Sequence, residues 1–220
     1  MQNRDPHKMV VFDLDNTLLQ AKFIDVCAEK YNFRQALALV RQLDYDAVSL
    51  TRRMASFLRD RRKKELTEIA ENIPLVFDTV EVVNELKNRN YKIGIITDSY
   101  QFVSQMVARK IGADFELSNE LVFIAGSTTG EVLVPSFFHY SNESTCKHQV
   151  CKTNALRHIC KKYKVNFEDC IAVGVDESSA CMIEHAGTGV SFCTTGELIR
   201  KVADKHIGER SFSELLNYAV

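Results

Sequence analysis

Two aspartates and a threonine follow directly on a short apolar segment near the start of the chain. The segment Met9–Phe12 continues as Asp13-Leu-Asp15-Asn-Thr17. Apolar runs of this length are typical of buried strands in parallel sheets. Folds with such sheets bind their ligands at the carboxyl ends of the strands. Carboxylates at i and i+2 point the same way from extended backbone. One could therefore attack phosphorus while the other transfers the proton, with a divalent cation between them. We predict a phosphoryl-transfer site; the alternative interpretation is a solvated acidic turn.

The elements that must position these residues follow an alternating pattern. Apolar runs alternate with helical periodicity, which predicts an α/β fold with a parallel sheet flanked by helices. The predicted strands are Met9–Phe12, Ile93–Ile96, Cys170–Val173 and Gly189–Phe192. The block Ala21–Asn72 is helical throughout and too long for a crossover, so we expect a small helical cap inserted after the first strand. Pro74 marks the return to the core, because the residue before proline resists helical geometry.

Two further local patterns are predicted. Lys87–Asn90 ends a helix just before the second strand. The runs Leu121–Ile124 and Glu131–Val134, joined by Ala125–Gly130, predict a β-hairpin.

Composition narrows the class of protein. The 220 residues are 45% hydrophobic and 26% charged, which suits one core with a small accessory unit. A formal charge of −1 gives no electrostatic footprint for nucleic acid or an acidic membrane. No stretch approaches the ~20 apolar residues of a membrane span, and Met1–Pro6 is polar where a signal peptide would be apolar. We therefore expect a cytoplasmic protein with neither nucleic-acid nor membrane partners.

Seven cysteines are an odd and fairly high number for such a chain. Five of them sit among apolar residues of expected helices and strands, and we predict that they are reduced, buried thiols. These are Cys27, Cys160, Cys170, Cys181 and Cys193.

The segment Asp13-x-Asp15-x-Thr17 resembles the first motif of the haloacid dehalogenase superfamily of phosphatases. The resemblance implies a Rossmann-like core and a second motif at Thr97. Its hydroxyl and the backbone amides that follow at a helix N-terminus, with Asp98 and Ser99, would bind the phosphoryl group. It also implies a lysine near a helix start. Lys152 opens a helical run and is the preferred candidate, with Lys147 as the alternative.

Over its whole length the chain resembles phosphoserine phosphatases and their relatives. In that family a cap glutamate seven residues after the second aspartate binds the substrate amine, and here that position is Lys22. The cap arginine that binds the substrate carboxylate matches Arg53. A reversed charge at the amine site disfavours phosphoserine, and Lys22 with Arg53 would suit a second anionic group. The alternative is that both residues belong to a solvated helix face.

The fourth motif departs from the family. Its Gly-Asp-x-x-x-Asp pattern corresponds to Gly174-Val175-Asp-Glu-Ser-Ser179, so valine and serine replace both aspartates. Mg²⁺ prefers oxygen ligands, which valine does not supply. We expect Asp13 and Asp15 to bind Mg²⁺ together with Asp176, or with Glu177 as the alternative to Asp176, unless the cation site is weak.

An insertion between the hairpin and Lys152 carries His139, Cys146, His148 and Cys151. These side chains could bind Zn²⁺ tetrahedrally, and free cysteines in a surface loop are the alternative. The region resembles a Cys-rich insertion of phosphoethanolamine/phosphocholine phosphatases.

Together these patterns predict a core of residues 1–20 and 74–220 with a helical cap of residues 21–73. The expected activity is Mg²⁺-dependent hydrolysis of a small phosphorylated metabolite, with Asp13 as nucleophile, Asp15 as acid and base, and Thr97 and Lys152 holding the phosphoryl oxygens. The competing hypothesis is a catalytically degenerate family member that binds a phosphorylated ligand or a protein partner without turnover.

Overall fold

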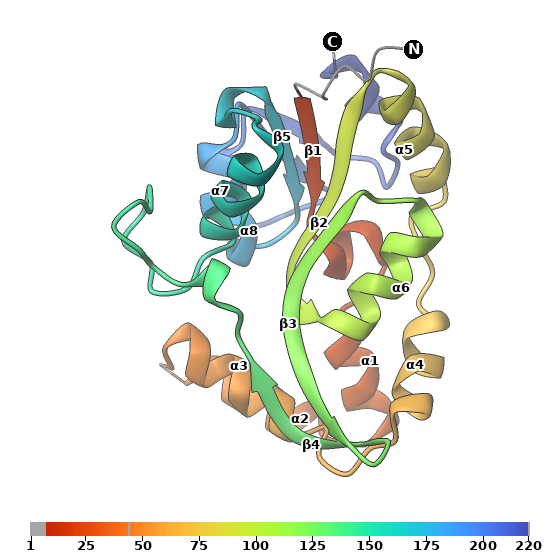
Figure 1. The fold of residues 1–220 in the computed structure, drawn as a ribbon. Coiled ribbons are helices and arrows are strands. Elements are labelled where there is room, and N and C mark those ends of the chain that lie inside the picture. Colours follow the sequence, from red (N-terminus) through yellow and green to blue (C-terminus); the bar gives the residue numbers. More distant parts are fainter. Residues whose placement is uncertain (1–7, 44, 220) are drawn as a thin grey trace.

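A single mixed sheet forms the centre of the molecule. The structure, a computed structural model, describes residues 8–43 and 45–219, and among these residues seven strands form one sheet (Figure 1). The order is β4-β3-β2-β1-β5-β6-β7, and all neighbours are parallel except the antiparallel pair β3–β4. The strands are β1 (Lys8–Phe12), β2 (Tyr91–Tyr100), β3 (Phe115–Ile124), β4 (Ser127–Leu133), β5 (Cys170–Gly174), β6 (Thr188–Phe192) and β7 (Lys205–Ile207).

Helices cover both faces of the sheet, and four more lie at one end. In Figure 1, α5 and α6 lie on one side of the strands and α7 and α8 on the other. The helices of these layers are α5 (Thr79–Asn88), α6 (Gln101–Ile111), α7 (Lys152–Tyr163), α8 (Glu177–His185) and α9 (Glu197–Val202). The end group consists of α1 (Phe23–Lys30), α2 (Arg34–Gln42), α3 (Ala47–Ser56) and α4 (Lys63–Glu71). The predicted fold class is confirmed.

Strand β1 is buried on both faces because its side chains alternate between two cores. Val10 and Phe12 pack into the core beneath α5 and α6, whereas Met9 and Val11 pack into the core beneath α7 and α8. A near-continuous apolar run is what a central parallel strand requires. The chain proceeds outward from β1 in both directions of the sheet, so the carboxyl end of β1 lies at the topological switch point, where α/β folds bind ligands.

The helical insert leaves and rejoins the core at adjacent points. The amide of Gln20 donates to the carbonyl of Pro74 at 2.9 Å, and that of Val76 donates to Leu18 at 2.9 Å. The helices of the predicted cap are therefore entered and left beside β1, and Pro74 lies at the return as predicted. The domain boundaries at residues 20/21 and 73/74 stay a prediction.

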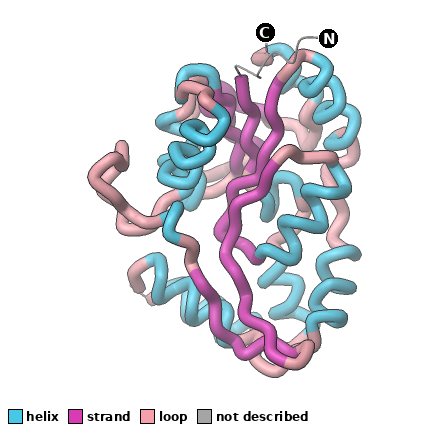
Figure 2. The backbone as a smooth tube through the Cα atoms, viewed as in Figure 1, coloured by secondary structure: helices cyan, strands magenta, loops and turns pink. Residues whose placement is uncertain are grey.

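The hairpin is longer than predicted, and the proposed six-residue connection is wrong. Ile124 pairs with Ser127, so Ala125 and Gly126 alone make the turn, with φ of 48° and 82°. Two consecutive positive φ values are typical of a tight hairpin turn whose twist matches the strands. The β-branched Thr128 and Thr129 then suit a strand rather than a loop. Figure 2 shows the two strands extending together from the sheet to the cap.

Two strand segments lie outside the predicted set. The first half of β3 pairs parallel with β2, and β7 forms an edge beside β6. Strand β7 is three residues long and exposes Lys205 and His206, so it lacks the apolar run that marks a buried strand. Short charged edges of this kind carry little sequence signal.

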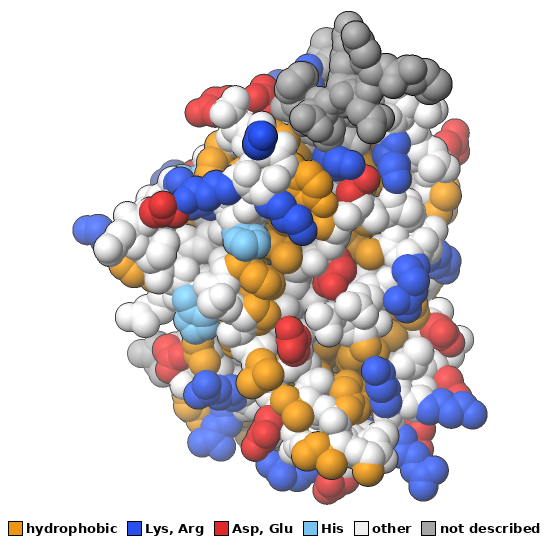
Figure 3. All heavy atoms as spheres, viewed as in Figure 1, with side chains coloured by type: hydrophobic (Ala, Val, Ile, Leu, Met, Phe, Trp, Pro, Cys, Tyr) orange, Lys and Arg blue, Asp and Glu red, His pale blue; other side chains and the backbone are white. Residues whose placement is uncertain are grey.

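All seven cysteines are free. Three of the five predicted as buried are buried, but Cys181 and Cys193 are only partly covered, and Cys151, which is not among the five, is buried. No helix in the described part of the chain is long and apolar enough to span a membrane. Residues 1–6, on which the signal-peptide argument rests, lie outside the described residues. On the face drawn in Figure 3, basic and acidic side chains are interspersed.

Candidate active site

Asp13 is held at the carboxyl end of β1 by three donors. Its side chain is 2% exposed. Oδ1 accepts hydrogen bonds from the Leu14 amide at 2.7 Å and from Lys152 Nζ at 2.9 Å. Oδ2 accepts one from Ser179 Oγ at 2.8 Å. Burial raises the pKa of the Asp13 carboxyl, and the Lys152 ammonium opposes that shift. Ser179, one of these three donors, thus fixes the orientation of Asp13.

Lys152 is the first residue of α7 and connects three segments of the site. Besides Asp13, its ammonium contacts Asp98 Oδ1 at 3.3 Å and donates to Ser178 Oγ at 2.9 Å and Ser179 Oγ at 3.2 Å. Burial alone would lower its pKa, but the neighbouring carboxylates, Asp13 first, raise it above the usual value. Lys152 therefore remains a cation. The alternative candidate Lys147 is exposed in the preceding loop.

Asp15 lies in the same cavity but has different partners. Its Oδ1 accepts from the amide of Phe23, the first residue of α1, at 3.1 Å, and its side chain also bonds to that of Ser99. Burial raises the pKa of Asp15 to about 7, and the charges of Asp13 and Asp98 add to the shift. A carboxyl group with this pKa can both donate and accept a proton near neutral pH.

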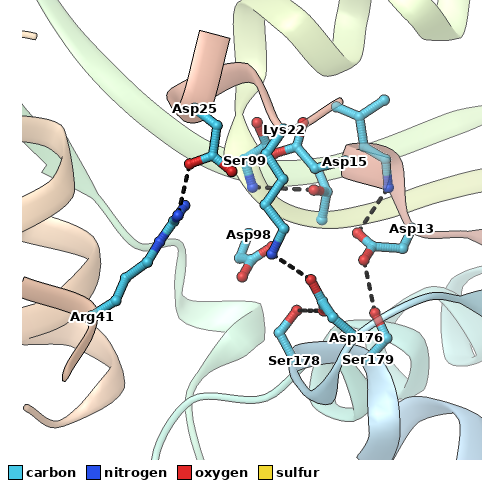
Figure 4. A network of polar contacts seen from close by, with 12 residues as sticks. Asp13, Asp15, Lys22, Asp25, Arg41, Asp98, Ser99, Asp176, Ser178 and Ser179 are labelled. Carbon is cyan, nitrogen blue, oxygen red and sulfur yellow. Dashed lines mark hydrogen bonds and ion pairs between the residues drawn. The ribbon is translucent and has the colours of Figure 1, made fainter. Parts of the chain in front are cut away.

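Asp176 forms an ion pair with the cap residue Lys22. The Lys22 ammonium lies 2.5 Å from Asp176 Oδ2, and Ser178 Oγ donates to Oδ1 at 2.8 Å (Figure 4). Burial raises the pKa of Asp176, but Lys152 and Lys22 outweigh it and lower the pKa to about 2. Asp176 is therefore a carboxylate at neutral pH, available as a cation ligand. Val175, half-buried, packs against the core instead.

A cavity of about 360 Å³ lies above these residues, between core and cap. The core supplies polar groups from the ends of β1 and β2 and from the start of α8, and the cap supplies side chains from α1, α2 and α3. The lining residues are Asp13, Asp15, Lys22, Ile24, Arg41, Leu50, Met54, Asp98, Ser99, Tyr100, Asp176, Glu177 and Ser178. This volume suits a small molecule.

The arginine at the cavity wall is Arg41, not the predicted Arg53. Arg41 pairs with Asp25 at 2.7 Å (Figure 4). Arg53 is exposed on α3 and lies over the ring of Tyr45, 5.7 Å from its centroid. The sequence around Arg53 does not show which face of each cap helix points into the cavity, so it did not identify Arg41.

Thr97 does not lie directly before a helix, as the second motif was expected to. Strand β2 continues to Tyr100, and α6 begins only at Gln101. The Thr97 side chain is buried, and its Oγ1 accepts from the Ser99 amide at 3.1 Å. Asp98 and Ser99 instead line the cavity, with the Asp98 carbonyl fixed by Asn119 Nδ2 at 2.8 Å.

Three of the four predicted zinc ligands meet, but the fourth is different. The ligand atoms of Cys146, His148 and Cys151 lie within 4.8 Å of one another and of Cys181 Sγ, on α8. His139 faces elsewhere, with Nε2 3.3 Å from the carbonyl of Val134. Cys181 is thirty residues beyond Cys151 in the sequence, so no spacing pattern connected them.

Comparisons with known proteins place this geometry in a family. The chain is 26% identical to the phosphoserine phosphatase of Methanocaldococcus jannaschii, over 96% of this chain and 97% of that one. It is 28% identical to that of Wolinella succinogenes, over 95% and 98%. A solved phospho-aspartyl intermediate analogue of phosphoserine phosphatase is 25% identical, with a TM-score of 0.82 over 96% and 98%. The haloacid dehalogenase-like hydrolase model matches residues 7–176, so this chain belongs to the haloacid dehalogenase-like hydrolase family.

Proposed function

We propose that this protein is a Mg²⁺-dependent phosphatase that hydrolyses a small phosphomonoester through an aspartyl-phosphate on Asp13. The observation that carries the proposal is the arrangement around β1. Asp13 is buried and oriented by Lys152 and Ser179, and Asp15 lines the same cavity. The similarity to phosphoserine phosphatases supports a phosphoric monoester hydrolase.

The first half-reaction uses both aspartates. A carboxylate oxygen of Asp13 attacks phosphorus as the bond to the ester oxygen breaks, and Asp15 gives its proton to the departing alkoxide. Lys152, which remains a cation beside Asp13, stabilises charge on the phosphoryl oxygens. The products are the free alcohol, the aspartyl phosphate and ionised Asp15.

The second half-reaction restores the site. Asp15, now ionised, takes a proton from a water molecule as that water attacks phosphorus, and the bond to Asp13 breaks to release inorganic phosphate. Ser179 and the Leu14 amide hold the carboxylate of Asp13 in place through both steps. Every group needed for proton transfer is therefore present on β1 and its adjoining turn.

The donor chemistry of the cavity fits a divalent cation. Five carboxylates line it (Asp13, Asp15, Asp98, Asp176 and Glu177), against two basic side chains (Lys22 and Arg41) and the Lys152 ammonium beside Asp13. A phosphate dianion would be repelled by this excess of negative charge, and hard oxygen donors suit Mg²⁺. Asp13 and Asp176 would hold the ion, with the main chain of Asp15. When bound, it would neutralise the charge of phosphoryl group and nucleophile.

Lys22 adds a feature that the proposed metal site must accommodate. Its ammonium is paired with Asp176, one of the proposed ligands. Binding of a divalent cation to Asp176 must therefore weaken this ion pair. We expect the affinity for Mg²⁺ to be lower than it would be without the lysine.

The proposal is tested by screening phosphomonoesters with Mg²⁺, Mn²⁺ and Co²⁺ and comparing Asp13→Asn with the wild type. An amide cannot form the acyl phosphate, so Asp13→Asn should abolish turnover and the acid-stable mass increase of one phosphoryl group in quenched protein. Glu177→Gln is the matched control, because Glu177 lines the cavity but is exposed. Turnover by well-folded Asp13→Asn would remove the mechanism.

Substrate choice follows from the charge of the cap. Lys22 lines the cavity at the position where the resemblance implies that a substrate's ammonium group would bind, and like charges repel. We expect phosphoserine to be hydrolysed with a lower kcat/KM than the best substrate of the screen. Comparable values for the two would show that Lys22 does not exclude the amine.

A further inference from the structure

The fold brings four soft metal ligands together beside the catalytic cavity. The ligand atoms of Cys146, His148, Cys151 and Cys181 all lie within 4.8 Å of one another. Cys146 and His148 lie in the loop between β4 and α7, Cys151 directly precedes α7, and Cys181 lies in the second turn of α8. We propose that these four residues hold one structural Zn²⁺ ion.

The number and type of ligands suit zinc. Three thiolates and one imidazole form a closed tetrahedral set, with Zn–S near 2.3 Å and Zn–N near ~2.0 Å. Ligand atoms of such a tetrahedron stand roughly 3.3–3.8 Å apart. Side chains already within 4.8 Å reach this spacing by small rotations. Mg²⁺ prefers oxygen ligands, so the ion of the catalytic cavity would not compete for this site.

The loop that carries Cys146 and His148 needs a cross-link. Residues 139–151 contain no helix or strand, and most of them are exposed. Near its base the loop is closed by the bridge between His139 and Val150 and by the Tyr140 amide donating to Gln149 at 2.8 Å. Figure 2 shows the loop extending away from the body of the molecule. Loops of this length are usually functional or mobile, and a metal ion would fix this one.

The site would also tie together two helices that build the catalytic centre. Cys151 immediately precedes Lys152, and Cys181 follows Ser179 by two residues. Lys152 Nζ contacts Ser178 and Ser179 across the same pair of helices. A zinc ion at this position would hold the start of α7 against α8, independently of whether the cavity binds Mg²⁺.

Elemental analysis of the full chain, purified in reducing buffer without chelator, tests the proposal. We expect about one zinc per chain in the wild type and little in Cys181→Ser. Cys193→Ser is the matched control: Cys193 is also a partly covered thiol but lies outside the cluster, so its zinc content should equal the wild type's. His139→Ala should likewise retain zinc, because His139 faces Val134.

A second measurement holds even if Cys181→Ser folds poorly. Co²⁺ in place of zinc gives visible bands of a tetrahedral site and a thiolate charge-transfer band, whose intensity reports three thiolates. His148 is exposed, so His148→Ala should fold while losing the ion to a chelator faster than the wild type does. Wild-type protein that holds no zinc, takes up no Co²⁺, or forms a Cys146–Cys151 disulfide instead would overturn the proposal, as would loss of zinc in His139→Ala alone.

Discussion

Among single residues, Lys22 and Asp176 form the least expected contact of the site. The pair joins the cap to the start of α8 at 2.5 Å, and both side chains are about one-third exposed. A partly exposed ion pair contributes about 1 kcal/mol or less. The contact is therefore weak enough for a divalent cation to displace, yet it stands directly on a proposed ligand of that cation.

Replacing Lys22 by methionine should strengthen Mg²⁺ binding. The substitution keeps the length of the side chain but removes the charge that competes for Asp176. Loss of ~1 kcal/mol of competition lowers the Mg²⁺ concentration for half-maximal activity by about fivefold. Lys30→Met, an exposed change at the other end of α1, which Lys22 directly precedes, serves as control. An unchanged Mg²⁺ requirement in Lys22→Met would mean that this ion pair does not oppose the metal.

Val175→Asp should also strengthen Mg²⁺ binding, by adding a ligand. The resemblance to phosphoserine phosphatases implies an aspartate at this position, and the half-buried Val175 directly precedes Asp176. We expect calorimetric titration with Mg²⁺ to show tighter binding in Val175→Asp, and weaker binding in Asp176→Ala. Glu177→Ala should bind as the wild type does. Tight wild-type binding that survives Asp176→Ala would contradict the assignment of the ligand.

Sequence reasoning found the residues whose chemistry is local and missed those that depend on distant segments. Asp13 and Asp15 share a strand end, and Lys152 opens a helix, so their motifs were visible. Arg41 and Cys181 reach their places through the register of α2 and α8, which no spacing records. The pairing of Lys22 with Asp176 spans 154 positions and needed the folded chain.

Among the elements, the β3–β4 hairpin connects the sheet to the cap through backbone hydrogen bonds. The amide of Asp60 donates to the carbonyl of Thr128 at 2.8 Å, and the amide of Thr128 donates to Arg61 at 2.9 Å. Gly130 lies against the end of α3: a Cβ there would stand 2.9 Å from Arg59 Cβ and 3.3 Å from backbone. The hairpin therefore contacts the cap directly and supports it.

Gly130→Ala should destabilise the protein more than Gly126→Ala. Both glycines have positive φ, 76° and 82°, but a Cβ at Gly126 meets nothing within 4 Å. Placing alanine at a positive φ lowers the free energy of unfolding by about 1–2 kcal/mol. Gly130→Ala adds a steric clash with the cap. Urea unfolding measures both, with Gly208→Ala, where φ is ordinary and space is open, as reference. Equal losses in the free energy of unfolding for Gly126→Ala and Gly130→Ala would show that a side chain at Gly130 does not clash with the end of α3.

The prediction of strands succeeded where apolar runs are long. It failed where pairing with a neighbouring strand determines the structure. Met9–Phe12 and Cys170–Val173 are buried on both faces and were found within one residue of their ends. The hairpin turn was misplaced because Ser127 and Gly130 are residues common in turns, although pairing with β3 draws the segment into a strand. The edge strand β7 has almost no apolar signal.

Across the whole molecule, the cavity exists only because core and cap meet. Its polar groups come from strand ends of the core, whereas Ile24, Leu50 and Met54 come from cap helices. The alternation of strands and helices predicted the parallel sheet, and the long helical block Ala21–Asn72 predicted the cap. The lateral strand order and the contact of hairpin with cap followed from neither, because both depend on packing between segments far apart in sequence.

Because the cation site joins separate parts of the fold, Mg²⁺ should stabilise the folded state as a whole. At 100 times Kd, binding to the native state alone adds about 2.7 kcal/mol, or roughly 5–10 °C in Tm for a chain of this size. Thermal unfolding should be followed while Mg²⁺ is added to protein never exposed to chelator, so that the Cys/His cluster is undisturbed.

The variants separate this effect from general salt screening. Asp176→Asn should lose most of the Mg²⁺-induced rise in Tm, because the ligand charge is gone while the shape of the side chain remains. Glu177→Gln removes an equal charge from an exposed neighbour that lines the same cavity, and its rise should match the wild type's. If both variants lose the rise equally, Mg²⁺ acts by screening the acidic cavity and not by binding to Asp176. Because the charges of Asp13 and Asp176 repel each other, a cation bound to both stabilises the folded chain, and the rise in Tm measures that binding.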